Sequence, residues 1–286
     1  MAQCGVCFRQ CRMQEGQRGS CGVRICRDGQ VIPENYGRVT SLALDPIEKK
    51  PLRRFRPGKK ILSVGSYGCN LRCPFCQNSE ISWSAEAMRY GKKAAEVTPE
   101  ELAETAVSLT GRGSIGVAYT YNEPLVGYEY VRDTAKLVWE AGLVNIIVTN
   151  GTASLPVLEE LLPYIDAMNI DLKGFTDHYY RDVLGGDLEM VLDFIRLAVK
   201  HCHVELTTLL VPGENDSEEE IRSLSAWIAG LTDQEGNRIG PMVPLHLSRF
   251  FPRYLMTDRA ATDVRQVYHL AEIAREHLQY VYTGNC

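Results

Sequence analysis

Three cysteines lie close together at Cys69, Cys73 and Cys76, with the spacing C-x3-C-x2-C. They follow a short apolar run at 61–64 that predicts a buried strand ending at Gly65, so they occupy the loop after that strand. Three thiolates on one tight loop can hold three corners of a four-iron cluster and leave the fourth iron open to another ligand. The alternative is a zinc knuckle whose fourth ligand lies elsewhere in the chain.

A second group of cysteines lies near the N-terminus, at Cys4, Cys7, Cys11 and Cys21, among glycines and charged residues. Few apolar residues accompany them, so this segment would not fold on burial alone and would be stabilised by a metal. Four thiolates at this spacing suit a tetrahedral zinc ion or a second iron–sulfur cluster. Unligated or redox-active thiols are the third alternative, and at the level of the sequence all three stay open.

The elements that must position these residues alternate between strand and helix, which predicts parallel strands covered by helices. The predicted strands are 61–65, 115–121, 144–148, 167–172, 203–210 and 244–249, with a short last strand at 280–282. The predicted helices are 98–109, 127–140, 154–162, 177–183, 188–200, 217–228 and 262–277. Six such units predict an α/β fold, a partial (β/α)6 barrel of the TIM type with a small Cys-rich N-terminal module.

The composition changes near residue 60, which suggests two parts. We expect a Cys-rich metal-binding module and linker at 1–60 and the partial barrel at 61–286. The end of the linker, Lys49 to Lys60, is rich in basic residues around Phe55 and is either a docking surface for an anionic partner or a solvated segment clamped by prolines.

In β/α barrels the reacting groups lie at the carboxyl ends of the strands. Glu123 follows the second predicted strand, and its carboxylate can accept hydrogen bonds from an ammonium group or can complement the dipole of the next helix. Thr149 and Asn150 follow the third strand. Asp171 and Lys173 stand two apart at the end of the fourth, so both point to the same side, where they form a salt bridge, bind a ligand, or do both.

The composition sets limits on partners and compartment. A formal net charge of −5 gives no general attraction to nucleic acid or to an anionic membrane, so we expect neither as a partner. There is no uninterrupted apolar run of membrane-spanning length. Ten cysteines without an export signal predict metal or redox chemistry in a reducing cytosol, and we expect a cytoplasmic protein.

The cysteine triad, with Phe75 in its aromatic position, resembles the signature of the radical S-adenosylmethionine (radical SAM) superfamily. This resemblance implies an enzyme with a [4Fe–4S] cluster on Cys69, Cys73 and Cys76 whose open iron binds SAM. It also implies reductive cleavage of SAM to a 5′-deoxyadenosyl radical that abstracts hydrogen from a substrate. The residues that the resemblance places at the cofactor are Phe75, Asn122, Glu123, Thr149, Asn150, Asp171 and Lys173.

Further stretches, including Asp171-x-Lys173 and 46–51, resemble the activase-like branch related to pyruvate formate-lyase activating enzymes. The chain is most similar there to the radical SAM protein of the AmmeMemoRadiSam system. It departs from the family at Tyr121-Asn122, where glycines are usual, and at Val148, where activases carry an aspartate.

The branch implies a protein substrate or partner protein and an electron donor such as flavodoxin or ferredoxin. Three alternatives stay open beside it: a glycyl-radical-enzyme activase, a radical SAM enzyme for a small molecule, and an iron–sulfur or zinc scaffold without SAM chemistry. The carboxylates and the lysine at the strand ends, Glu123, Asp171 and Lys173, weigh against the scaffold.

Overall fold

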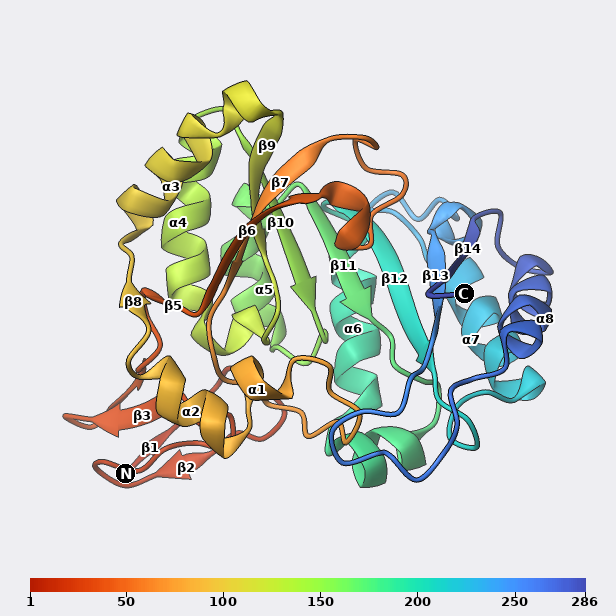
Figure 1. Cartoon of the computed structure of the whole chain (residues 1–286), viewed down its shortest axis with the longest axis horizontal. Coiled ribbons are helices and arrows are strands. Elements are labelled where there is room, and N and C mark those ends of the chain that lie inside the picture. The colour runs from red at the N-terminus through yellow and green to blue at the C-terminus, as the bar shows by residue number, and fades with distance from the viewer.

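The computed structural model describes all 286 residues and is built around one eight-stranded sheet, in the order β14-β13-β12-β11-β10-β9-β7-β6 (Figure 1). All neighbouring pairs from β7 to β14 run parallel, and β6 pairs antiparallel with β7. The strands are β6 (Ser41–Pro46), β7 (Lys60–Gly65), β9 (Ser114–Tyr119), β10 (Val144–Thr149), β11 (Ala167–Asp171), β12 (His203–Leu210), β13 (Leu245–Arg249) and β14 (Val281–Gly284). Because β6 and β14 are not neighbours, the barrel is open, as the sequence predicts.

Helices follow the parallel strands and cover the outer face of the sheet (Figure 1). They are α3 (Pro99–Ser108), α4 (Tyr128–Glu140), α5 (Leu155–Leu161), α6 (Leu188–Ala198), α7 (Glu218–Ala229) and α8 (Val264–Arg275), within a few residues of the predicted bounds. Their starts follow local chemistry: Thr98 and Glu101 form a capping box at α3, with Pro99 in the first turn. Asp187, Ser217 and Asp263 cap α6, α7 and α8, each by a side-chain oxygen that accepts from a backbone amide of the first turn.

One predicted helix, 177–183, has a different form. Residues Tyr179–Leu184 make a π-helical turn that ends at Gly185, whose φ of 63° lies in the left-handed region that glycine tolerates. Tyr179 and Tyr180 are buried in this turn. The packing of these two rings determines the π-helical form of the backbone, and the local helix propensity of the sequence does not predict that form.

The segment between the Cys-rich module and the first parallel strand is more structured than a linker. β6 extends the central sheet by one edge strand, and beyond it Ile47 and Leu52 are fully buried. These two side chains join an apolar cluster with Ile61, Ala118, Val144, Ile146 and Ala167 at the amino ends of the strands. Residues 47–56 therefore close that end of the barrel; we call them the plug. The division of the chain into domains at residue 60 stays a prediction.

The first forty residues form small hairpins beside the carboxyl ends of the strands (Figure 1). They contain β1 (Ala2–Gln3) paired with β2 (Arg12–Met13), and β3 (Arg24–Arg27) paired with β4 (Gln30–Pro33). They also contain β5 (Arg38–Val39), whose partner β8 (Ala95–Glu96) lies later in the chain. Two short helices, α1 (Ser79–Ser82) and α2 (Ala85–Gly91), follow the cysteine loop. None of the helices combines the length and the apolar character needed to cross a membrane.

Candidate functional site

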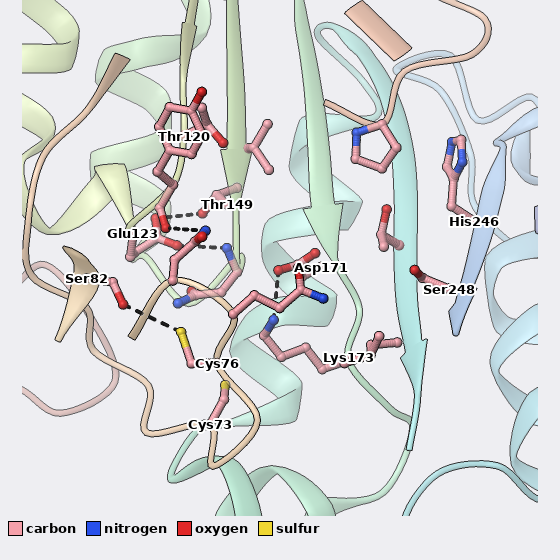
Figure 2. A pocket seen from close by; sticks show the side chains of 18 of the residues that line it. Cys73, Cys76, Ser82, Thr120, Glu123, Thr149, Asp171, Lys173, His246 and Ser248 are labelled. Carbon is pink, nitrogen blue, oxygen red and sulfur yellow. Dashed lines mark hydrogen bonds and ion pairs between the residues drawn. The ribbon is translucent and has the colours of Figure 1, made fainter. Parts of the chain in front are cut away.

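A cavity of about 590 Å³ lies against the inner face of the sheet (Figure 2). Its size is typical of pockets that hold a small molecule or cofactor. The cavity brings together every residue that the sequence places at the cluster or at SAM: Cys69, Cys73, Cys76, Phe75, Asn122, Glu123, Thr149, Asn150, Asp171 and Lys173. Their assembly follows from the parallel sheet, because all of them lie on the loops or last residues at one edge.

The cysteine loop is held in place by backbone contacts with distant segments. The amide of Cys69 donates to the carbonyl of Cys21 at 3.3 Å, and the amide of Arg72 donates to the carbonyl of Leu184 at 2.8 Å. Gly68 has a φ of 97°, and a Cβ there would lie 2.6 Å from the side chain of Val23. The loop is thus shaped by the protein around it.

All three thiols of the loop are free, with Cys73 buried and the other two half-buried. Burial raises the pKa of the Cys69 thiol, and it raises the pKa of Cys73 to about 11 although the charge of Lys173 acts in the opposite direction. Cys69 and Cys73 therefore hold their protons more tightly than free thiols do, and they release them when a metal binds.

No fourth cysteine lines the cavity. Three thiols, no fourth cysteine and a set of charged groups beside them are the donor set expected for a cluster with one open iron and a polar ligand on it. No three His, Cys, Asp or Glu side chains of the chain are arranged around one point as a single metal ion requires.

Glu123 is the most completely enclosed charged group of the cavity, with 3% of its surface exposed. Its Oε1 accepts from the amide of Leu125 at 3.0 Å and from the hydroxyl of Thr149 at 2.8 Å, and its Oε2 accepts from the amide of Asn150 at 2.8 Å (Figure 2). Burial raises the pKa of Glu123 to about 7, although these hydrogen bonds favour the carboxylate. Three of the predicted residues thus form one hydrogen-bonded unit.

Asp171 and Lys173 form an ion pair of 2.7 Å beside the cysteine loop (Figure 2). Burial acts to lower the pKa of Lys173, but the charges of Asp171 and Cys73 raise it well above its ordinary value. Lys173 is therefore a permanent cation next to the thiols. The salt bridge that the sequence leaves open as an alternative is present, and it leaves the ammonium group on the cavity wall.

Asn122 and Phe75 line the cavity while their own contacts are with the protein. The side-chain amide of Asn122 donates to the carbonyls of Tyr67 and Gly68 at 3.2 and 3.1 Å, which ties the second strand end to the cysteine loop. Phe75 packs edge-on against Phe250, with 6.3 Å between the ring centroids. Both residues fix the loop that carries the thiols.

Tyr121 departs from the glycine of the family motif, and the structure gives it a role. It holds a φ of 73°, so the backbone keeps the left-handed form that glycine would adopt. Its hydroxyl donates to Asp45 at 3.0 Å, and Lys50 pairs with the same carboxylate oxygen at 2.9 Å. Sequence reasoning missed this buried network; the acidic residue next to the proline at 46 is the only local signal for it.

The cavity also extends beyond the predicted residues. His246 and Ser248 on β13 line it (Figure 2). Thr283 on β14 and Arg53 of the plug line it as well. His246, Ser248 and Thr283 were not predicted from the sequence, because alternating polar residues on a strand are typical of any half-buried sheet face. Arg53 lies in the basic stretch at 49–60, which the sequence leaves open as a docking surface or a solvated segment.

The N-terminal cysteines lie close to the cysteine loop. Cys4, Cys7 and Cys21 are buried and Cys11 is half-buried. Burial raises the pKa of Cys4 and of Cys7, and the neighbouring thiols act in the same direction. Arg9 extends from this group to the carbonyl of Asn70 at 2.9 Å, so the N-terminal module braces the loop that carries the triad. The structure does not arrange these thiols around one metal ion.

The chain is similar to known proteins over almost its whole length. A family model described as the Radical SAM superfamily matches residues 63–224. The uncharacterized protein MJ0808 of Methanocaldococcus jannaschii is 39% identical over 286 residues, which cover 99% of this chain and 81% of that protein. The pyruvate formate-lyase-activating enzyme of Clostridium pasteurianum is 29% identical over 220 residues, covering 74% of this chain and 89% of that enzyme.

Among solved structures, that of Streptococcus suis SuiB bound to S-adenosylmethionine is similar with a TM-score of 0.58 and 13% sequence identity. The match covers 79% of this chain and 52% of that chain. At this identity the likeness shows a shared fold, which agrees with the open, mostly parallel sheet.

Proposed function

We propose that this chain, an enzyme that belongs to the radical SAM superfamily, cleaves SAM reductively on a [4Fe–4S] cluster and abstracts hydrogen from a substrate. The observation that carries the proposal is the meeting of three loop thiols, one enclosed carboxylate and one permanent ammonium group in a single cavity. A scaffold without SAM chemistry would not need the last two groups there.

Cys69, Cys73 and Cys76 would hold the cluster on three of its irons. When bound, the cluster would supply the electron that cleaves SAM to methionine and a 5′-deoxyadenosyl radical, which would take a hydrogen atom from the substrate. The ammonium group of Lys173, oriented by Asp171, would donate to the carboxylate of SAM.

Glu123 would accept from the amino group of SAM. A carboxylate offers about four acceptor positions, and three are occupied by Leu125, Thr149 and Asn150. The fourth acceptor position is on Oε2, because Oε2 has one donor from the protein and Oε1 has two. A ligand ammonium group there would complete the coordination of the carboxylate and would favour its charged form.

We further propose a protein substrate or an obligate partner protein. The support comes from relatives whose names describe enzymes that activate pyruvate formate-lyase, and from the open side of the sheet between β6 and β14. Within the basic stretch at 49–60, Lys49 and Arg53 line the cavity, while Lys60 begins β7 at the amino ends of the strands. An electron donor such as flavodoxin or ferredoxin would serve the cluster.

A glycyl-radical activase is the narrower second candidate, favoured by the names of the same relatives. It predicts a stable protein radical in a partner after incubation with SAM and reductant, observable by electron paramagnetic resonance. A small-molecule radical SAM enzyme would show no such signal. The N-terminal cysteines are proposed to carry zinc or a second iron–sulfur cluster.

The test is to reconstitute the protein anaerobically with iron and sulfide, add SAM and dithionite, and measure 5′-deoxyadenosine and methionine. Cys73→Ala should abolish both products, because two thiolates do not hold the cluster with one open iron. Cys202→Ala is the matched control, since Cys202 is half-buried outside the cavity. Unchanged product from the Cys73→Ala protein would refute the proposal.

A further inference from the structure

Two of the three sulfurs of the cysteine loop have a polar side chain beside them. The hydroxyl of Ser82 lies 3.5 Å from the sulfur of Cys76, and Figure 2 shows this contact. The side-chain amide of Asn150 lies 3.8 Å from the sulfur of Cys69. Hydrogen bonds to sulfur are longer than those to oxygen, because the sulfur atom is larger. Both distances therefore fit hydrogen bonds to atoms that would hold the cluster.

The geometry of Ser82 determines which way its hydrogen bond runs. Ser82 is buried, and the sulfur of Cys76 is the one partner of its hydroxyl in the chain. Its backbone amide donates to the carbonyl of Asn78 at 2.8 Å, and its carbonyl accepts from the amide of Gly68 at 2.6 Å, so the residue is fixed at both sides of the cysteine loop. In the free thiol either atom of the pair can donate. A cysteine that binds iron has lost its hydrogen and can only accept, so Ser82 is then the donor.

The orientation of the Asn150 amide follows from its other contacts. Its oxygen accepts from the backbone amide of Thr152 at 3.0 Å, so its nitrogen is the atom that faces Cys69. That nitrogen carries two hydrogens, of which one is donated to Asn70 at 3.0 Å and the other is left for the sulfur. The backbone amide of Asn150 donates to Glu123 at 2.8 Å. One residue therefore contacts both the cysteine loop and the carboxylate proposed for SAM.

Hydrogen bonds of this kind change how easily a cluster takes up an electron. Reduction adds one negative charge to the cluster, and part of this charge lies on the sulfurs of its cysteines. A donor at a sulfur stabilises the reduced form more than the oxidised form, and it therefore raises the reduction potential. Burial of the loop acts in the opposite direction, because a medium of low polarity disfavours added charge. The third sulfur, that of Cys73, has the charge of Lys173 near it. Each of the three sulfurs thus has one neighbouring group that stabilises negative charge.

We propose that two side chains, Ser82 and Asn150, donate hydrogen bonds to the cluster thiolates and thereby raise the reduction potential of the cluster. One electron passes from the donor to the cluster in this step. No bond forms or breaks at either side chain, and both keep their hydrogens. The two residues act through the thiolates and are positioning residues. The inference rests on the proposed function, because it concerns the cluster of the same cavity.

The test is a redox titration of the reconstituted protein without SAM, in which electron paramagnetic resonance measures the fraction of reduced cluster at each potential. At the midpoint potential of the wild type, Ser82→Ala should lower the ratio of reduced to oxidised cluster at least about threefold, which is about 28 mV for a one-electron couple. Asn150→Leu should shift the titration in the same direction. Ser79→Ala is the matched control and should titrate like the wild type, because Ser79 is buried in the same helix and has no hydrogen bond to a sulfur.

If a variant does not retain its iron, the resonance Raman spectrum of the wild-type protein replaces it. Exchange into D2O should shift the stretching bands between iron and the cysteine sulfurs, because the donated hydrogens exchange. An unchanged midpoint in either variant, an equal shift in Ser79→Ala, or bands that do not move in D2O would each overturn the inference. SAM cleavage by the wild-type protein with dithionite is measured in parallel. It reports on the proposed function alone, so the two can fail separately.

Discussion

Replacing Glu123 by glutamine gives the sharpest test of how the cavity would bind SAM. The variant removes a buried negative charge from the position proposed for the amino group of SAM. One charge-assisted hydrogen bond contributes about 1.5–3 kcal/mol, so we expect the dissociation constant of SAM to rise about 10- to 150-fold. Equilibrium dialysis of the reconstituted protein measures this value directly.

The same substitution also has a predictable effect on folding. The glutamine oxygen can still accept from Leu125 and Thr149, but its amide group then meets the amide of Asn150, and two donors face each other. A buried donor without a partner costs about 1–3 kcal/mol. Urea unfolding should therefore show a less stable protein, and SAM binding should be measured where the variant is fully folded.

Glu220→Gln is the matched control. Glu220 is a buried carboxylate that accepts from the amide of Phe175 at 2.6 Å, and it does not line the cavity. We expect lower stability and unchanged SAM binding from it. If Glu123→Gln gives the same pattern as this control, Glu123 is structural and the reasoning is refuted.

The pH dependence provides a second readout for Glu123. Its pKa is raised to about 7, above the value of an unfolded chain, so the folded protein binds the extra proton between about pH 4.5 and 7. Its contribution to stability is present at low pH and is lost as the pH rises through about 7. SAM needs the carboxylate, so affinity should increase over the same range in the wild type and not in the glutamine variant.

Three further predictions concern the surroundings of the cavity. Lys50→Met should destabilise the protein by about 1.5–3 kcal/mol, because it removes the enclosed cation of Asp45 and leaves that half-buried carboxylate with Ser63, Tyr121 and the exposed Lys49. Lys49→Met removes the exposed partner of the same carboxylate and should change the unfolding free energy by less than about 1 kcal/mol. The double variant Cys4→Ala and Cys7→Ala should lose the metal of the N-terminal module and keep the iron of the triad, which metal analysis of the reconstituted protein measures. If the wild-type protein holds about eight irons per chain and the double variant about half as many, the module carries a second cluster and not zinc. Arg9→Met removes two hydrogen bonds to backbone carbonyls of the loop region, so a chelator should extract iron from the reconstituted protein faster, and an equal rate would argue against the brace.

Much of the site could be predicted because it lies at chain positions that the topology brings together. Buried strands can be recognised in the sequence as apolar runs. Because parallel strands have their carboxyl ends at the same edge of the sheet, Glu123, Thr149 and Asp171 were expected to be neighbours. That Glu123 is bound by the hydroxyl of Thr149 and the amide of Asn150 could not be predicted. Such contacts depend on the position of each loop to within an ångström, which no spacing encodes.

The missed residues share a physical cause. Asp45 and Lys50 lie in a proline-rich segment whose charge suggests solvent, yet Lys50 is 3% exposed, because Tyr121 and Asp45 provide it with a partner. Glu205 and His246 lie within strands, where an isolated polar residue in the pattern indicates only a face of the sheet. Each is identifiable only through its partner, and the partners are 41 residues apart in the chain.

Residues 1–60 contact the barrel at both ends of the cavity, and these contacts support the residues that line it. On the cysteine side, the carbonyl of Cys21 receives the amide of Cys69, and Arg9 holds the carbonyl of Asn70. On the opposite side, the plug places Arg53 on the wall of the cavity through Glu205. Both ends of the cavity are therefore completed by the segment that precedes the first parallel strand. A fragment of 61–286 alone would keep the thiols and the ion pair of β11 but would lose the supports on which their positions depend.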